Sequence, residues 1–310
     1  MKVVSLFSGI GGLDRGFINN GFDIIWANDF DKYAVETYKA NYSNHIELGD
    51  INLIDFDDIP DFDILIGGFP CQPFSMMGSQ QGFDDARGTL FFRIAEILNN
   101  KIQNGHKPRA IVLENVRSLK THDKGRTFAT IQRILEGLGY TFFAKVLNSA
   151  HYGVPQTRNR TYIVCFANEN ADFAFPESVE LTTTLQDLLE KDVDDKYFLS
   201  ERILPTILSN GTGGYVGKSE IDLKIARPLC ATMAKMHRAC QDNYVTQNDR
   251  VRRLVPRECA RLQGFDDDFV IPVSDSQAYK QFGNAVTVNV SDAVAREVRR
   301  TLEILGEWHR

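Results

Sequence analysis

Short runs rich in β-branched and aromatic residues alternate with amphipathic stretches over the first half of the chain. The runs expected to form strands are residues 3–7, 23–29, 45–50, 63–68, 110–115, 142–148 and 161–167. Stretches with helical periodicity lie among them at 31–41, 89–104 and 125–139. Strands that alternate with helices form βαβ units, which predicts an α/β fold with a doubly wound, mostly parallel sheet. Ligands bind beyond the carboxyl ends of such strands, so the residues there are the first candidates for a site.

The composition is that of a globular chain. Hydrophobic residues make up 43% and charged residues 25% of 310 residues, which excludes a disordered protein. No apolar run approaches the roughly 20 residues that a membrane span needs, and the N-terminus lacks the features of a signal peptide. We therefore expect a cytoplasmic protein with no membrane partner. Five scattered cysteines without a CxxC pair indicate neither a disulfide framework nor a metal site.

The alternating pattern ends near residue 168 and helical periodicity resumes at 256–263 and 286–305. We therefore expect two domains: residues 1–185 with 275–310, and a smaller irregular domain at 186–274. The net charge of −6 argues against a nucleic-acid partner. However, residues 166–195 hold nine acidic residues and one lysine, whereas 196–261 hold twelve Lys or Arg and six Asp or Glu. This local basic excess is either a solvated surface or a nucleic-acid contact.

Three strand ends in the first half predict a pocket for a nucleoside-bearing cofactor. Gly9 and Gly11 follow the first strand, where glycines let a ligand approach the backbone closely. Asp29 ends the second strand and can accept hydrogen bonds from ribose hydroxyls, and Phe30 can stack on a base. Asp50 and Ile51 follow the third strand and offer an acceptor and an apolar contact for adenine. The dinucleotide pattern GxGxxG is not met, which argues against a pyrophosphate and a nicotinamide oxidoreductase.

The next strand ends carry candidates for the chemistry. Cys71 lies in a loop stiffened by two prolines, where a nucleophile would be placed. Glu114 follows an apolar run, so burial should raise its pKa and let it act as an acid. Arg158 and Arg160 stand two residues apart, on one face of an extended segment, and suit a ring carbonyl or a phosphate oxygen. The alternative for the arginines is a surface ion pair of little energetic value.

Taken together, the motifs closely resemble the DNA (cytosine-5) methyltransferase family of the bacterial restriction–modification type. The matching stretches occur in the family's order and cover nearly the whole chain outside about 168–250. They are LFSGIGGLDRGF (6–17), GDI (49–51), GFPCQPFS (68–75), RGTLFF (87–92), ENV (114–116), QTRNR (156–160), RLVPRECARLQGF (253–265) and QAYKQFGNAV (277–286).

The resemblance implies S-adenosyl-L-methionine as the cofactor, with S-adenosyl-L-homocysteine as its product, in a Rossmann-like methyltransferase fold. Asp29 would hold the ribose, Phe30 would stack on adenine, and Asp50 and Ile51 would contact the adenine edge. The remaining cofactor contacts would come from Phe7, Gly9, Gly11, Gly68, Pro70, Leu90, Asn284 and Val286.

The resemblance also implies the reaction. The target cytosine would be flipped out of double-stranded DNA. Cys71 would attack its C6, Glu114 would hydrogen-bond N3 and the amino group, and Arg160 would hold O2 with Arg158 nearby. The methyl group would then pass to C5. The enzyme would act as a monomer on nucleoid DNA, with a cognate restriction endonuclease for the same site.

The middle region would be the target-recognition domain, with basic residues on phosphates and loops that read bases. We expect base reading in residues 227–238, and closure over the DNA by the loop at 72–87. Met77 stands where an apolar side chain could wedge into the base stack. The residues expected to contact DNA are Ser75, Met77, Arg87, Arg227, Lys235, Arg238 and Arg257.

Two other functions remain open. The first is RNA methylation by the same chemistry, as in the tRNA-acting branch of the family, although the loop here reads PCQPFS rather than that branch's usual PCQPFT. The second is a cofactor-binding regulator that has lost catalysis. The presence of Cys71, Glu114, Arg158 and Arg160 together argues against the regulator.

Overall fold

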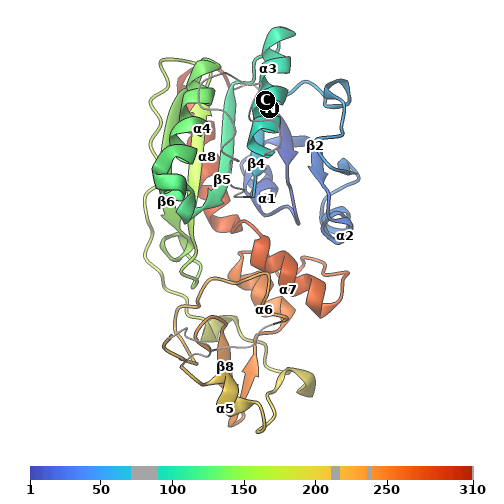
Figure 1. The fold of residues 1–310 in the computed structure, drawn as a ribbon, viewed down its shortest axis with the longest axis vertical. Coiled ribbons are helices and arrows are strands. Elements are labelled where there is room, and N and C mark those ends of the chain that lie inside the picture. The colour runs from blue at the N-terminus through green and yellow to red at the C-terminus, as the bar shows by residue number, and fades with distance from the viewer. Residues whose placement is uncertain (71–89, 211–216, 236–238, 309–310) are drawn as a thin grey trace. The chain divides into compact units, whose positions relative to one another are not determined.

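The computed structural model describes residues 1–70, 90–210, 217–235 and 239–308, and these form two compact units. The first unit comprises Met1–Leu147, Asn159–Glu177 and Val290–Arg310, and the second comprises Asn148–Arg158 and Ser178–Asn289. None of the described helices has the length and apolar character that a bilayer span requires. Figure 1 shows the elements of both units.

A seven-stranded sheet forms the centre of the first unit, with the strand order β3-β2-β1-β4-β5-β7-β6. Strands β1 to β5 pair in parallel and β7 pairs antiparallel to β5, which confirms the predicted mostly parallel sheet. The bounds are β1 (Lys2–Leu6), β2 (Asp23–Asp29), β3 (Ile46–Leu48), β4 (Ile64–Gly68), β5 (Ala110–Val116), β6 (Thr141–Asn148) and β7 (Asn159–Phe166). All seven strands were expected from the sequence, within a few residues at each end.

Helices cover both faces of this sheet (Figure 1). α3 (Leu90–Gln103) and α4 (Arg126–Gly137) bury their apolar faces in one large cluster with alternate residues of the central strands, such as Leu65 and Ile111. α1 (Gly12–Asn19) packs against α8 (Val288–Ile304), since a Cβ at Gly16 would lie 2.3 Å from Ser291 Oγ. α2 (Lys32–Asn41) connects β2 to β3 and is capped by the Asp31 carboxylate.

The second unit is less regular. It contains α5 (Leu204–Ile207), the hairpin of β8 (Tyr244–Gln247) and β9 (Arg250–Arg253), α6 (Pro256–Leu262) and α7 (Asp275–Asn284). A fully buried ion pair between Arg252 and Glu258, at 2.7 Å, ties the hairpin to α6. Glu258 also accepts a hydrogen bond from the Val255 amide at the start of that helix.

Four elements of the second unit were not predicted from the sequence: α5, β8, β9 and α7. The hairpin turn places Asn248 and Asp249 at positive φ, a conformation that is usually marked by glycine and here is not. β9 reads Arg-Val-Arg-Arg, which does not have the composition of a typical strand. Most residues of α7 were identified as part of the matching stretch QAYKQFGNAV, but no helix was predicted there.

Candidate active site

The loop after β1 is shaped by two glycines and the aromatic ring of Tyr42. Gly11 has φ of 80°, and a Cβ there would lie 2.3 Å from the Tyr42 ring, so only glycine fits. The Tyr42 hydroxyl donates a hydrogen bond to the Gly11 carbonyl at 2.9 Å. Gly9 also has positive φ, and among the described residues a Cβ at Gly9 would meet no atom within 4 Å. Positive φ is the reason that glycine suits this position of the loop.

Asp29 joins this loop to the end of β2. The Gly9 and Asp31 amides each donate a hydrogen bond to its carboxylate at 2.8 Å. Burial raises the pKa of Asp29 above its ordinary value, because desolvation disfavours the carboxylate. Phe30, the next residue, is 74% exposed. An acceptor and an exposed aromatic ring thus stand side by side in the chain beside the glycine loop.

The end of β3 is held at the same edge by Asn28. Its side-chain amide donates to the carbonyls of Glu47 and Gly49, at 3.1 and 3.0 Å. Asp50 follows and is exposed, whereas Ile51 is 2% exposed. The structure therefore brings the predicted cofactor residues of three strands to one edge of the sheet.

The fourth and fifth strands meet at the position where the predicted nucleophile loop begins. Gly68 pairs in register with Glu114, and the Asn115 amide donates to the carbonyl of Phe69 at 2.7 Å. Asn115 therefore fixes the chain just ahead of Pro70. Cys71 itself lies outside the described residues.

Glu114 is buried, as its place after an apolar run predicts, and it meets Arg160. The Arg160 Nε lies 3.1 Å from Glu114 Oε1. Tyr162 is the register partner of Glu114, so Arg160 stands two residues along the same face of β7. The guanidinium of Arg160 can hold the carboxyl group of Glu114 in place. The carboxyl group can then form hydrogen bonds to the polar edge of a ring.

Arg158 has a different environment. Its guanidinium donates to the carbonyls of Leu229, Gly283 and Ala285 at 2.9 to 3.1 Å, and the residue is 3% exposed. Arg158 and Arg160 therefore bind different partners. The alternative of a surface ion pair does not describe Arg158, which is buried and binds backbone carbonyls. Arg160 does form an ion pair, with Glu114, and its side chain is 21% exposed.

Three further cofactor candidates occupy defined positions. Leu90 is the first residue of α3 in the first unit. Asn284 ends α7 and is exposed, and Val286 follows it in the segment that leads to α8. The last two belong to the second unit.

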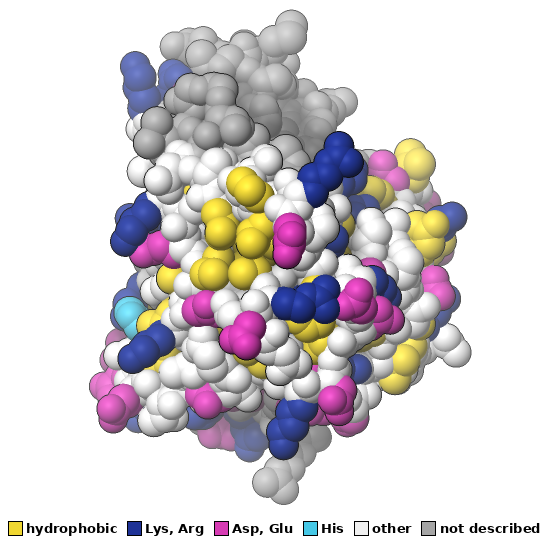
Figure 2. Space-filling model, turned by 90° about the horizontal axis from the view of Figure 1, so that it is seen from below, with side chains coloured by type: hydrophobic (Ala, Val, Ile, Leu, Met, Phe, Trp, Pro, Cys, Tyr) yellow, Lys and Arg dark blue, Asp and Glu magenta, His cyan; other side chains and the backbone are white. Residues whose placement is uncertain are grey.

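The candidates for DNA contact fall into two groups. Ser75, Met77, Arg87 and Arg238 lie outside the described residues. Arg227 pairs with Glu220, and Arg257 donates to the carbonyls of Asp266 and Phe269, so both have partners within the second unit. Lys235 is exposed. On the face shown in Figure 2, basic and acidic side chains are interspersed.

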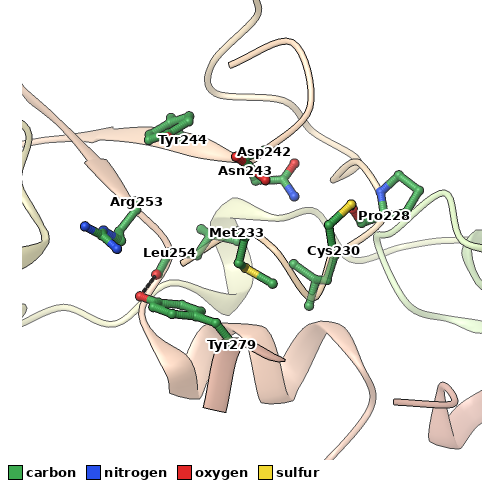
Figure 3. A pocket seen from close by; sticks show the side chains of 10 residues that line it. Pro228, Cys230, Met233, Asp242, Asn243, Tyr244, Arg253, Leu254 and Tyr279 are labelled. Carbon is green, nitrogen blue, oxygen red and sulfur yellow. Dashed lines mark hydrogen bonds between the residues drawn. The ribbon is translucent and has the colours of Figure 1, made fainter. Parts of the chain in front are cut away.

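Part of the segment 227–238 lines a small cavity in the second unit (Figure 3). Its volume is about 20 Å³, enough for one water molecule and too small for a base. The Tyr279 hydroxyl donates to the Leu254 carbonyl on one wall, at 2.7 Å. The cavity is lined by Pro228, Leu229, Cys230, Met233, Asp242, Asn243, Tyr244, Arg253, Leu254 and Tyr279.

The sequence reading assigned no role to several residues that shape these sites. Asn28 and Asn115 lie at the ends of apolar strands, and their amides donate to the chain at neighbouring strand ends. Gln156 is fully buried and donates to the Leu262 carbonyl at 2.6 Å while accepting from the Leu229 amide. A buried amide side chain needs hydrogen-bond partners, so an Asn or Gln beside an apolar run predicts a bond to neighbouring backbone.

Known proteins resemble this chain over nearly its whole length. A family model described as C-5 cytosine-specific DNA methylase matches residues 1–300. The Type II methyltransferase M.NgoBI of Neisseria gonorrhoeae is 45% identical over 95% of this chain and 92% of its own length. M.NlaX of Neisseria lactamica is 41% identical over 99% of this chain and 98% of its own. The solved S. pombe Dnmt2 methyltransferase superposes with a TM-score of 0.81 at 21% identity, covering 98% of this chain and 99% of that one.

Proposed function

The chain belongs to the C-5 cytosine-specific DNA methylase family, and from this premise we propose that it methylates C5 of a cytosine flipped out of duplex DNA. It is a DNA (cytosine-5-)-methyltransferase with Type II restriction–modification relatives. We further propose that it is the modification enzyme of such a system, with a cognate restriction endonuclease that acts on the same site.

S-adenosyl-L-methionine is the methyl donor of this family, and the residues at the strand ends fit it. Glycine at position 9 carries no side chain, so a ligand can approach the backbone of this loop closely. The Asp29 carboxylate can accept from ribose hydroxyls and exposed Phe30 can stack on adenine. Asp50 and Ile51 offer an acceptor and an apolar surface for the adenine edge. Phe7, Gly11, Gly68, Pro70, Leu90, Asn284 and Val286 complete the proposed set.

The chemistry begins with Cys71, because C5 of cytosine is a poor nucleophile until C6 is attacked. The Cys71 thiolate forms a bond to C6, and the electron pair of the C5–C6 double bond moves into the ring. Glu114, in its protonated form, donates a hydrogen bond to N3, while its second oxygen accepts from the amino group. Arg160 holds O2. The C5 electron pair would then attack the methyl group, whose bond to the donor's sulfonium sulfur breaks to leave S-adenosyl-L-homocysteine. A base would remove H5, the pair it leaves would re-form the C5–C6 double bond, and the C6–S bond would break to release the Cys71 thiolate.

The observation that carries this proposal is the pair of buried Glu114 and partly buried Arg160, in which Glu114 is the register partner of Gly68. Glu114 is 7% exposed, and it lies across from a residue only three positions before Cys71 in the chain. The carboxyl group of Glu114 and the guanidinium of Arg160 thus lie close to the start of the loop that carries Cys71. Arg158 acts as a positioning residue, because its guanidinium holds three backbone carbonyls.

We assign DNA recognition to residues 186–274, the proposed target-recognition domain, beside a catalytic domain of 1–185 and 275–310. Base flipping is required because Cys71 and the methyl donor must reach C6 and C5 from the two faces of the ring. The nucleic-acid contacts would come from Ser75, Met77, Arg87, Arg227, Lys235, Arg238 and Arg257. We propose that a monomer acts on the nucleoid DNA of a bacterial cytoplasm.

Labelled S-adenosyl-L-methionine, offered with either duplex DNA or tRNA, tests the substrate. We expect label in DNA, and bisulfite sequencing of DNA from expressing cells then identifies the methylated cytosines. Label in tRNA alone would refute the proposal in favour of the RNA-methylating alternative.

A second experiment tests the nucleophile. In duplex DNA with 5-fluorocytosine at the site, fluorine replaces H5 and a base cannot remove it. The C6–S bond should therefore persist as a covalent adduct in the wild type. Cys71→Ser should form no adduct and Cys165→Ser should form it normally, since Cys165 is a buried residue of β7. An adduct that survives in Cys71→Ser would assign the nucleophile elsewhere.

A further inference from the structure

Arg93, at the end of the first turn of α3, contacts the chain that follows β3. Its Nε donates to the Ile51 carbonyl at 3.0 Å, and its Nη2 donates to the Ile54 carbonyl. The guanidinium also lies over the Phe56 ring, 4.0 Å from the ring centre, and the side chain is 12% exposed. One side chain thus contacts three residues of the segment 51–56.

These contacts fix the segment in a way that few other side chains could. Ile51 and Ile54 are 2% and 7% exposed, so their carbonyls lie next to the apolar core and need donors. The guanidinium supplies two donors in a rigid fork and stacks on an aromatic ring at the same time. A lysine has neither the fork nor the flat face. Glu96, one turn further along α3, lies 3.2 Å from Nη1 and balances the charge.

We infer that Arg93 is a positioning residue for the adenine end of the cofactor site. The inference rests on the proposed function, in which Asp50 and Ile51 contact adenine. The Ile51 carbonyl is held directly, and the Leu53 amide closes the turn by donating to the Asp50 carbonyl at 2.8 Å. Arg93 therefore connects this turn to the helix that begins at Leu90, another proposed cofactor contact. Without the fork, the turn would sample other positions before each binding event.

A purely structural role would have a different signature. If Arg93 only stabilised the fold, its loss would lower the melting temperature and leave the affinity of the folded protein for the cofactor product unchanged. A positioning role predicts weaker binding of the adenosine part at a temperature where the protein is fully folded. The value of kcat and the affinity for DNA should then stay near those of the wild type.

The test compares Arg93→Met and Arg93→Lys with Arg133→Met, which removes an exposed arginine from α4. Calorimetry measures the Kd of S-adenosyl-L-homocysteine and of 5′-methylthioadenosine, which keeps the adenine and ribose but lacks the amino-acid end. For Arg93→Met we expect both Kd values to rise by about tenfold, the effect of one lost charge-assisted hydrogen bond. Arg93→Lys should retain most of the packing and lose about threefold. Arg133→Met should match the wild type.

The outcomes separate this inference from the proposed function. If the wild type binds S-adenosyl-L-homocysteine and both Arg93 variants bind it equally well, Arg93 has no positioning role. A loss for S-adenosyl-L-homocysteine without a loss for 5′-methylthioadenosine would also overturn the inference, because the effect would then lie at the amino-acid end. If Arg93→Met does not fold, Arg93→Lys alone decides the question. A wild type that binds neither ligand would instead refute the cofactor assignment itself.

Discussion

Glu114 and Arg160 come from neighbouring strands and meet with Arg160 Nε 3.1 Å from Glu114 Oε1. The antiparallel pairing of β5 and β7 brings them onto one face, although they lie far apart in the sequence. A buried carboxyl held by a guanidinium keeps a defined orientation without substrate. The two proposed contacts to the cytosine ring therefore form one preorganised unit.

Replacing Glu114 by Gln should abolish most of the methyl transfer. The amide keeps the size but cannot deliver a carboxylic proton to N3, so we expect kcat to fall by about 10²- to 10⁴-fold. Transfer of labelled methyl groups to DNA measures the rate. The affinity for S-adenosyl-L-homocysteine should stay within about twofold of the wild type, because the proposed contacts of Glu114 are to the cytosine ring and not to the cofactor. Glu136→Gln, at an exposed position of α4, is the matched control, and equal rates for the two variants would remove Glu114 from the chemistry.

Replacing Arg158 by Lys should destabilise the second unit. The ammonium cannot reach the carbonyls of Leu229, Gly283 and Ala285 together, which leaves buried acceptors without their donor. We expect a loss of at least about 2 kcal/mol in the free energy of unfolding, measured by urea denaturation. Arg133→Lys should change that free energy by less than about 0.5 kcal/mol, as exposed substitutions usually do. A small effect at Arg158 would show that the carbonyls find other donors.

Asp14 should make the stability pH-dependent. It is fully buried and accepts hydrogen bonds from Ser5 Oγ and Tyr38 Oη at 2.9 and 2.8 Å, and desolvation raises its pKa to about 6. A raised carboxyl pKa means that the folded state binds the proton more tightly. The stabilisation is therefore complete below pH 3.8, the ordinary pKa, and is lost as the pH rises through 6. This shift corresponds to about 3 kcal/mol.

Asp14→Asn isolates this effect, because an amide does not titrate. The unfolding free energy of the wild type, minus that of Asp14→Asn, should decrease between pH 4 and pH 7 by up to about 3 kcal/mol. Urea denaturation of both proteins across this range measures the difference. Parallel curves would show that Asp14 keeps its ordinary pKa in the folded protein.

Binding to DNA should weaken steeply with salt despite the net charge of −6. Affinity depends on local phosphate contacts, and each lysine that binds a phosphate adds about 0.9 to the slope of log K against log salt. Lys235→Gln should therefore reduce that slope by about one, whereas Lys39→Gln, on α2, should not change it. A flat salt response of the wild type would mean that the basic segment is only a solvated surface.

The internal ion pairs limit how much of the basic excess is available to DNA. Lys196, Lys218, Arg227, Arg250, Arg252 and Arg261 all form ion pairs with acidic residues in the described structure. A count of charges along the sequence treats them all as potential phosphate contacts. Pairing is a tertiary property, so only the structure distinguishes exposed Lys235 from Arg252, which is fully buried.

The sequence by itself determined the sheet, its strands and the positions of the candidate residues at strand ends. Hydrophobic periodicity is a local property, and the rule that ligands bind at carboxyl ends then selects Gly9, Asp29, Asp50 and Glu114 without coordinates. The hairpin with Asn248 and Asp249 in its turn was not predicted, because the turn contains no glycine and the strand that follows it reads Arg-Val-Arg-Arg.

Only the tertiary structure decided which partners these side chains have. Arg158 and Arg160 look equivalent in QTRNR, yet one binds backbone carbonyls of the second unit and the other pairs with Glu114. Arg93 lies in an ordinary amphipathic helix, and nothing in its neighbourhood in the sequence indicates that it holds Ile51. Such partners come from segments distant in the chain, and periodicity carries no information about which distant segments meet.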